Sequence, residues 1–292
     1  MPFSVTVLVY FPKKTRKESM SIQNMKNDVL PGFLCFGDAE ARGNLGLLDQ
    51  YLAMRWVQEN INKFGGDVNK VTVMGHSSGA ASIMYHLVSP RTKQLFQSAI
   101  IMSGCLTSPI AQKSNTLIIE ASFQLAKSLG CYFPHDTKLV VRCLRTKSAF
   151  ELLEAYRKQN NKGNSDVFLP VIDSFLPASE QYLSKSPLET LEEGSFMKIP
   201  LLTGIVDYDG VAYLGLGHGE ELIYLFGKSF AREVLGRDFT VQEEIMSATI
   251  RKIWHDFIKN GSTISQCYVY STWTRNSTSF IPHNLHYSSQ TN

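Results

Sequence analysis

One segment constrains the fold of this chain most: a short apolar run that leads into a serine between two glycines and then into a helix. Val71 to Met74 is rich in β-branched and apolar residues, which is typical of a strand buried on both faces of a parallel sheet. Gly75 and Gly79 flank Ser77 in the pattern G-x-S-x-G, and residues 78–88 have helical spacing. Between a strand and a helix, this pattern predicts a tight turn that projects the serine hydroxyl above the sheet edge. Ser77 is therefore a candidate nucleophile; the alternative is a glycine-containing junction with an incidental serine.

Two further apolar runs read as buried strands. Residues 98–102 stop at Ser103-Gly104, and residues 199–206 stop at the turn 207–210. Helical segments lie between the strands, so apolar strands alternate with amphipathic helices. This alternation predicts an α/β fold with a mostly parallel central sheet, helices on both faces and functional residues at the carboxyl ends of the strands.

Two helices are recognised by the spacing of their apolar residues. Residues 47–63 carry apolar side chains at i, i+3, i+4 and i+8, which predicts one buried helix face made of Leu48, Tyr51, Leu52 and Trp56. Residues 241–259 carry a second such stripe, made of Met246, Ile250, Ile253, Trp254 and Phe257. We interpret both helices as structural.

The length and composition of the chain limit its class. With 292 residues, of which 43% are hydrophobic, the chain is long enough for one large α/β domain or two small ones, and we expect a single domain over residues 1–292. Residues from about 262 to 292 are polar and weakly patterned, so we expect a loosely ordered tail. Because 29 basic residues stand against 26 acidic ones, a nucleic-acid partner is not expected.

No stretch is long and apolar enough to predict a transmembrane segment, and the beginning of the chain does not have the pattern of a signal peptide. Other features are typical of extracellular proteins. Asn260 and Asn276 begin N-glycosylation sequons, and Cys131 and Cys143 are closely spaced.

A serine nucleophile needs a histidine that accepts its proton and a carboxylate that orients the histidine. Downstream of Ser77, Asp209 and His218 stand in the order serine, acid, histidine that α/β-hydrolases use. The alternatives are a solvated turn aspartate and a surface or helix-capping histidine. His76 precedes the nucleophile, and we expect its side chain to point away from it.

A run of motifs resembles the type-B carboxylesterase family, whose members include cholinesterases and inactive adhesion proteins. The resemblance covers roughly residues 32 to 260 and implies an α/β-hydrolase fold that is incomplete relative to the full family domain. The motifs that carry it are G-N-L-G-L-L-D-Q at 43–50, A-M-R-W-V-Q-E-N-I at 53–61, F-G-G-D at 64–67, V-T-V-M-G-H-S-S-G at 71–79, L-V-S-P at 87–90, L-F-Q-S-A-I-I-M-S-G at 95–104, F-L-P at 168–170, P-L-L-T-G at 200–204 and H-G-E-E-L-I-Y-L-F at 218–226.

The resemblance implies a set of functional residues. Ser77 matches the nucleophile, Asp209 the position usually held by glutamate, and His218 the base, while the amide of Ser78 matches one donor to the oxyanion. The implied activity is hydrolysis of a small-molecule carboxylic ester through an acyl-enzyme, with no metal or organic cofactor.

The resemblance also implies a disulfide and an environment. L-G-C at 129–131 and C-L-R at 143–145 look like the small disulfide loop of the family, which joins Cys131 to Cys143. Cys35, Cys105 and Cys267 are then expected to stay unpaired with one another. A secreted or extracellular location is implied in the same way.

Two departures from the family pattern predict slow turnover. The run Val5 to Phe11 leads into Pro12-Lys13-Lys14 where the family has a glycine-rich oxyanion segment, and His218 follows Asp209 by only nine residues, without the helices and strand that the family inserts. Losing one oxyanion donor costs about 100- to 1000-fold in turnover. The alternative function is therefore a catalytically silent, cholinesterase-like protein of recognition or adhesion.

Overall fold

The computed structural model describes residues 32–108, 111–160, 167–206, 209 and 218–261, together with the course of short strands at 5–9, 19–22, 269–271 and 283–285. Pro12, Lys13 and Lys14, Cys267 and Asn276 lie outside the described residues. Most of the tail expected from about 262 onwards also lies outside them, apart from the strands β6 (Val269–Ser271) and β7 (His283–Leu285), which pair antiparallel.

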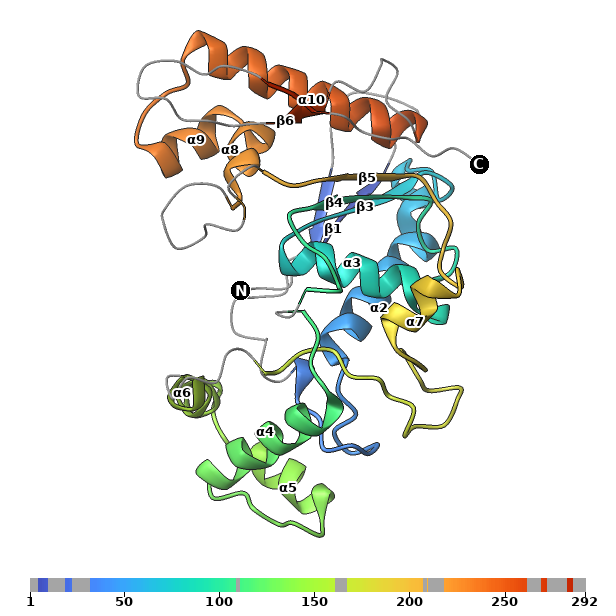
Figure 1. Ribbon diagram of the computed structural model, residues 1–292, viewed down its shortest axis with the longest axis vertical. Coiled ribbons are helices and arrows are strands. Elements are labelled where there is room, and N and C mark those ends of the chain that lie inside the picture. The colour runs from blue at the N-terminus through green and yellow to red at the C-terminus, as the bar shows by residue number, and fades with distance from the viewer. Residues whose placement is uncertain are drawn as a thin grey trace.

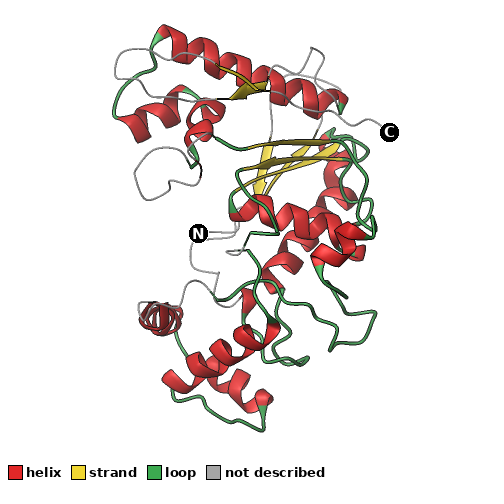
Figure 2. Ribbon diagram, viewed as in Figure 1, coloured by secondary structure: helices red, strands yellow, loops and turns green. Residues whose placement is uncertain are grey.

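The central sheet explains how distant segments of the chain meet. The described strands form a five-stranded sheet in the order β2-β1-β3-β4-β5, in which β3, β4 and β5 run parallel and β1 pairs antiparallel with both β2 and β3. The prediction of a parallel α/β sheet is confirmed for β3, β4 and β5 (Figure 2). The strands are β1 (Val5–Val9), β2 (Ser19–Ile22), β3 (Val71–His76), β4 (Ser98–Met102) and β5 (Leu201–Gly204).

Helices cover both faces of the sheet, as the alternating pattern predicted. In Figure 1, α2 and α3 lie on one side of the sheet and α8 and α10 on the other, while α4, α5 and α6 lie at the far end of the molecule from α10. The helices are α2 (Leu45–Asn60), α3 (Ser78–Val88), α4 (Asn115–Ser128), α5 (Thr137–Leu144), α6 (Ala149–Asn160), α7 (Pro187–Glu192), α8 (Glu220–Phe226), α9 (Lys228–Leu235) and α10 (Val241–Asn260), with 3₁₀ helices η1 (Ile61–Phe64) and η2 (Pro90–Thr92).

The two faces of β3 and β4 belong to different hydrophobic clusters. Val73 and Ile101 pack with Ile83 of α3, whereas Met74 and Ile100, one position along each strand, pack with Phe257 of α10. Because successive side chains of a strand point to opposite faces, two apolar layers form on one pair of strands. Both strands are buried throughout, apart from the last residue of β3, which confirms their prediction as core strands.

The predicted buried face of α2 is confirmed only in part, because Leu48 and Tyr51 pack against the core but the other two residues do not. Leu52 and Trp56 are exposed, by 55% and 44%, and the buried face instead includes Gln50, Met54 and Val57. The physical reason is that Gln50 is satisfied inside the protein, where its Oε1 lies 2.8 Å from His86 Nε2. A polar residue with a buried partner thus takes a core position that apolar spacing alone assigns elsewhere.

The third predicted core strand is a strand, but it is not buried. β5 pairs with β4 on one side and stands at the end of the described sheet. Leu201 is 43% exposed, and Ile205, just beyond the strand, is 73% exposed. An apolar run therefore predicted the strand correctly and its burial incorrectly, because burial depends on which strands and helices come to lie beside it.

The second predicted stripe is confirmed for four of its five residues. Met246, Ile250 and Trp254 pack beneath α8 and α9, and Phe257 packs on the sheet. At the start of α10, Thr240 and Glu243 form a reciprocal capping box. It provides hydrogen-bond acceptors for backbone N–H groups that have no preceding helical turn to bond to.

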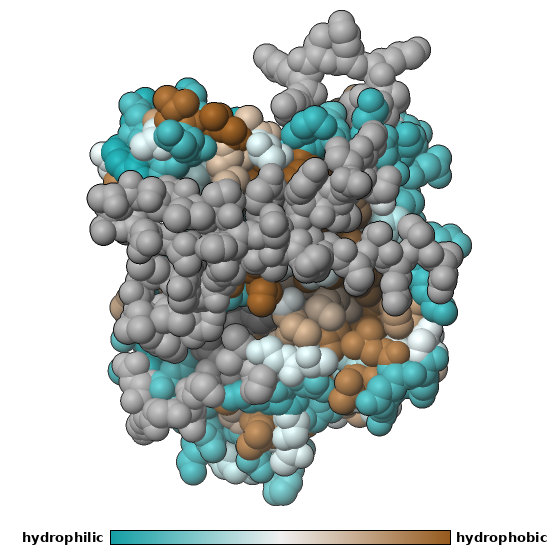
Figure 3. Space-filling model, turned by 45° about the horizontal axis from the view of Figure 1, so that its top comes forward, coloured by the Kyte–Doolittle hydropathy of each residue, from teal (hydrophilic) through white to brown (hydrophobic). Residues whose placement is uncertain are grey.

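Hydrophobic surface remains on the outer side of this helical layer. Figure 3 shows brown patches among the teal there, and the exposed apolar side chains of α9 and α10 are Val234, Leu235, Val241 and Ile245.

The predicted disulfide is present. Cys131 and Cys143 are bonded, with their Cα atoms 5.5 Å apart, and join the end of α4 to α5. Cys35 is a buried free thiol and Cys105 an exposed one.

We expect replacement of both Cys131 and Cys143 by serine to lower the free energy of unfolding by about 3 kcal/mol. The bridge closes a loop with a sequence separation of 12, and in the chain-entropy model such a loop restricts the unfolded chain by about this amount. Urea denaturation of oxidised protein measures the change, with Cys105→Ser as the control for loss of a thiol outside the bridge. A loss below about 0.5 kcal/mol contradicts the expectation.

Burial of His86 makes stability depend on pH. Its Nδ1 contacts the hydroxyl of buried Tyr182, and burial lowers the pKa of His86 to about 3 from an ordinary value near 6.5. Between these two values the unfolded chain binds a proton that the folded chain does not. The free energy of unfolding therefore falls as the pH falls below about 6.5.

We expect this single group to contribute a slope of about 1.4 kcal/mol per pH unit near pH 5. Denaturation at about pH 7, 6 and 5 measures the slope, and His86→Gln should remove that part of it. His135→Gln, at an exposed turn, is the matched control. Equal slopes for the protein and its His86→Gln variant would show that His86 is not buried as a neutral ring.

Candidate active site

The carboxyl ends of the three parallel strands meet at one edge of the sheet. His76 at the end of β3 is opposite Met102 of β4, and Met102 is opposite Gly204 at the end of β5. The residues that follow each strand, including Ser77 and Ser103, therefore lie along one edge. In open parallel sheets this is the edge where ligands bind.

Ser77 has the backbone of a sharp strand-to-helix turn. Its φ of 56° and ψ of −122° are unusual for a residue with a side chain, and such strained conformations cost about 1 to 3 kcal/mol. The amide of Ser77 donates to the carbonyl of Met102 at 2.9 Å, and its carbonyl accepts from Ala81 at 3.1 Å. The same residue thus ends the strand ladder and begins the hydrogen bonds of α3.

Two glycines make room for this turn. A Cβ on Gly75 would lie 2.4 Å from the backbone of Gly79, and a Cβ on Gly104 would lie 2.1 Å from the carbonyl oxygen of Ser77. Side chains at either position are sterically excluded. The glycine that the motif places at position 75 therefore has a direct steric cause. Gly104, which lies outside the motif, is required for the same reason.

The first residue of α3 is Ser78. Its amide belongs to the amino-terminal turn of the helix, where backbone N–H groups have no partner within the helix. Ser77 stands at the N-cap position, but its side chain does not cap the helix.

Asp209 and His218, the candidate acid and base, lie together. Nδ1 of His218 is 2.5 Å from Oδ1 of Asp209, and both side chains are mostly buried. A carboxylate on Nδ1 directs the other ring nitrogen, Nε2, to act as the proton acceptor. The intervening residues 210–217, where a strand is not expected, lie outside the described residues.

His76 is a member of the cluster that sequence reasoning missed. Its ring lies against that of His218, with the two centroids 4.6 Å apart and the planes tilted by 43°. The sequence placed it next to Ser77 but carried no signal for this contact, because the partner comes from the turn that precedes α8. Burial and the nearby His218 lower the pKa of His76 to about 4, while Asp209 opposes the shift.

Two more side chains complete the cluster. Oε1 of Glu221 is 3.4 Å from Nε2 of His76 and accepts a hydrogen bond from the hydroxyl of Ser103 at 3.3 Å. Burial, with a contribution from nearby Asp209, raises the pKa of Glu221. The cluster therefore pairs two imidazoles with two carboxylates at the sheet edge.

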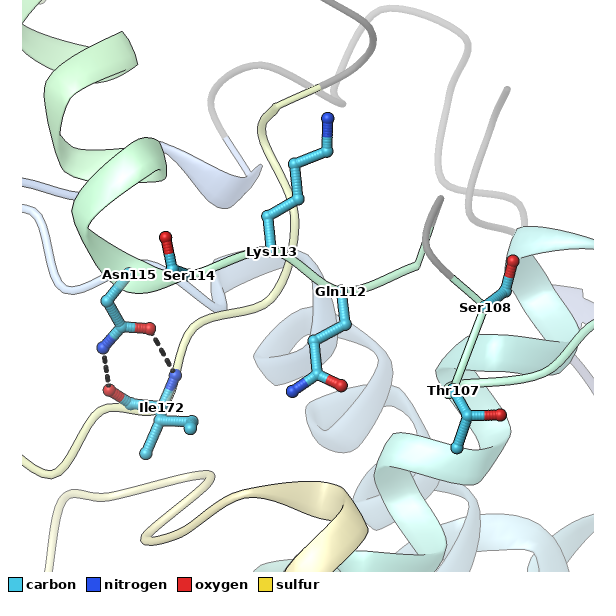
Figure 4. Close-up of a pocket in the computed structure, with 7 residues that line it drawn as sticks. All are labelled: Thr107, Ser108, Gln112, Lys113, Ser114, Asn115 and Ile172. Atoms are coloured by element: carbon cyan, nitrogen blue, oxygen red, sulfur yellow. Dashed lines mark hydrogen bonds between the residues drawn. The ribbon is translucent and has the colours of Figure 1, made fainter.

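A separate polar pocket opens at the start of α4, with a volume of about 470 Å³ (Figure 4). The side chain of Asn115 is fixed there by two hydrogen bonds with the backbone of Ile172. The lining residues are Thr107, Ser108, Gln112, Lys113, Ser114, Asn115 and Ile172. They include no member of the histidine cluster.

Neither a metal centre nor a membrane helix is found in the part of the chain that the structure describes. No three histidine, cysteine, aspartate or glutamate side chains there are grouped to hold a metal ion. None of its helices is both long and apolar enough to cross a bilayer.

Comparison with known proteins assigns the family. Residues 30–217 match the carboxylesterase family, and this stretch includes the strained serine and the aspartate. The chain belongs to this family. The lineage predicted from the sequence motifs is thereby confirmed.

Named relatives agree with this membership. The chain is 35% identical over 194 residues to Cholinesterase 2 of Branchiostoma lanceolatum, which covers 64% of this chain and 53% of the relative. It is 40% identical over 189 residues to the acetylcholinesterase of Bungarus fasciatus, a match that covers 64% of this chain and 30% of the relative. It is 35% identical over 183 residues to a carboxylic ester hydrolase of Bombus ignitus, a match that covers 62% of this chain and 31% of the relative. The matched region thus spans about a third to a half of these relatives.

We expect Gly104→Ala and Gly75→Ala each to lower the free energy of unfolding by about 1 to 3 kcal/mol, because the added methyl group must displace backbone at the turn. Chemical denaturation measures the change. Gly32→Ala is the matched control, since its Cβ would meet the nearest atoms at an ordinary 3.4 Å. Unchanged stability in both turn variants would show that the turn is looser than described.

Proposed function

We propose that this protein hydrolyses small-molecule carboxylic esters, with Ser77 as nucleophile, His218 as base and Asp209 as the acid that orients the base. The observation that carries the proposal is the 2.5 Å contact between His218 Nδ1 and Asp209 Oδ1, in which the ring of His218 also lies against His76, the residue before Ser77. Family membership supports it, because named relatives include cholinesterases and a carboxylic ester hydrolase.

The reaction proceeds in two halves. Nε2 of His218 takes the proton of the Ser77 hydroxyl as its oxygen attacks the ester carbonyl carbon, and the resulting imidazolium returns this proton to the departing alcohol. Water then attacks the acyl-enzyme with His218 again as the base, which releases the acid and restores Ser77. Asp209 stabilises the imidazolium in both halves.

The oxyanion is stabilised in part by the amide of Ser78 at the start of α3. The glycine-rich segment that supplies the family's other donors has no counterpart after Phe11. Each donor contributes about 100- to 1000-fold to turnover, so we expect slow hydrolysis. A glycine-rich loop grafted after Phe11 should raise the rate more than any single substitution.

We further propose that the protein passes through the secretory pathway. The described disulfide and the position of Asn260, exposed at the end of α10, support this environment. Glycans are proposed at Asn260 and at Asn276.

We expect a fluorophosphonate probe to label Ser77 alone, because this serine combines a strained turn with a nearby paired histidine. Peptide mass spectrometry of the labelled protein locates the adduct. Ser77→Ala should abolish labelling and reduce hydrolysis of a short aryl ester at least about a thousand-fold, since triad members act as a unit.

The controls separate the site from general reactivity. His218→Ala and Asp209→Ala should also suppress labelling, whereas Ser108→Ala, on the separate pocket, should leave it unchanged. Labelling at Ser78 or elsewhere contradicts the assignment. An unlabelled protein that retains its fold favours the silent recognition function instead.

A further inference from the structure

The turn that precedes α8 and carries His218 lies against a second histidine at the sheet edge, His76. His76 is the last residue of β3, and its ring lies near three residues of the segment 218–221. The ring of His218 lies against it, a Cβ on Gly219 would come within 3.5 Å of its Cε1, and Glu221 reaches its Nε2. Gly219 has a φ of 92°, which favours glycine at this close approach.

An apolar contact joins the same two elements. Leu222 and Leu225 of α8 pack with Met74 and Met102 beneath the cluster. This contact positions the helix as a whole but does not orient the ring of His218. The ring of His218 instead has a hydrogen bond to Asp209 on one side and the ring of His76 against it.

The polar contacts of His76 are incomplete. Among the described residues, Nε2 of His76 and Oε2 of Glu221 are buried without a hydrogen bond of good geometry. Oε1 of Glu221, by contrast, is held by the hydroxyl of Ser103. Unsatisfied buried polar atoms are costly, and they often occur where function requires a particular arrangement.

We propose that His76, held by Glu221 and Ser103, is a positioning residue that orients the ring of His218 over Ser77 while remaining uncharged itself. This inference rests on the proposed function for the identity of the base. The charged and titratable groups that face His76 are His218 and Asp209 on one side and Glu221 on the other.

The charge state of His76 follows from this environment. The pKa of His76 is lowered to about 4, so the ring is neutral near pH 7. A second imidazolium beside His218 would oppose the positive charge that forms when the base takes the serine proton. The neutral ring gives the contact surface without this repulsion.

The proposal distinguishes the ring of His76 from its nitrogens. His76→Phe keeps an aromatic face and should retain kcat/KM within about tenfold. His76→Ala removes the face and should lower kcat by about 100-fold with little change in KM, as expected for a misplaced catalytic group. The acid limb of the pH profile of kcat/KM should be the same for the protein and for His76→Phe.

Two further variants test the surroundings of the ring. Glu221→Gln preserves the shape of the side chain and should lower kcat/KM less than Glu221→Ala. His255→Ala, at an exposed position of α10, is the matched control and should leave the rate unchanged.

A second measurement does not depend on activity. Hydrogen exchange of the amides of residues 218–222 should accelerate at least about tenfold in His76→Ala relative to the protein and to His76→Phe, with exchange in α10 unchanged. If the protein fails to hydrolyse esters, this comparison still decides the positioning role.

Opposite outcomes are equally specific. If His76→Phe is as inactive as His218→Ala, then His76 is itself a proton acceptor and the proposal is wrong. If His76→Ala matches His255→Ala in both rate and exchange, His76 does not position His218. A general loss of protection that extends to α10 assigns His76 a merely structural role and also overturns the proposal.

Discussion

The contact between Gly104 and the carbonyl of Ser77 is the constraint on which the site depends. β4 must place a residue without a side chain directly against the turn that follows β3, because any Cβ there would overlap the Ser77 carbonyl. The strained backbone of Ser77 is then held between the ladder of the parallel strands and the first turn of α3. Since strain of this kind persists only where the surroundings enforce it, the packing of β3, β4 and α3 determines where the serine hydroxyl can lie.

The second half of the site reaches the sheet by another route. His218 precedes α8, which packs with α10 on the face of the sheet opposite α3. The nucleophile and the candidate base therefore belong to different layers of the molecule. Their relative position depends on contacts across the sheet edge, among which the hydrogen bond from His218 to Asp209 and the ring of His76 are the most direct.

Features with local causes were predictable from the sequence. The junction at Ser77 depends on neighbouring residues, so glycine spacing and strand pattern were sufficient, and the order of Asp209 and His218 was enough to propose the pair. Features with distant causes were not. Gln50 is buried because its Oε1 accepts a hydrogen bond from His86, β5 is exposed because of its place in the sheet, and the partners of His76 come from the distant segment 218–221. Neither the spacing of apolar residues nor the order of motifs predicts such contacts.

The place of β5 at the end of the described sheet has a consequence for how the protein behaves in concentrated solution. An end strand presents backbone N–H and C=O groups on its outer side, and β5 combines them with the exposed apolar side chains of Leu201 and Ile205. Proteins commonly protect such an edge with charges, proline or a covering segment, because an open edge is a template for pairing with another chain. The strand that positions one end of the site is thus also an edge of the described sheet that is suited to intermolecular strand addition.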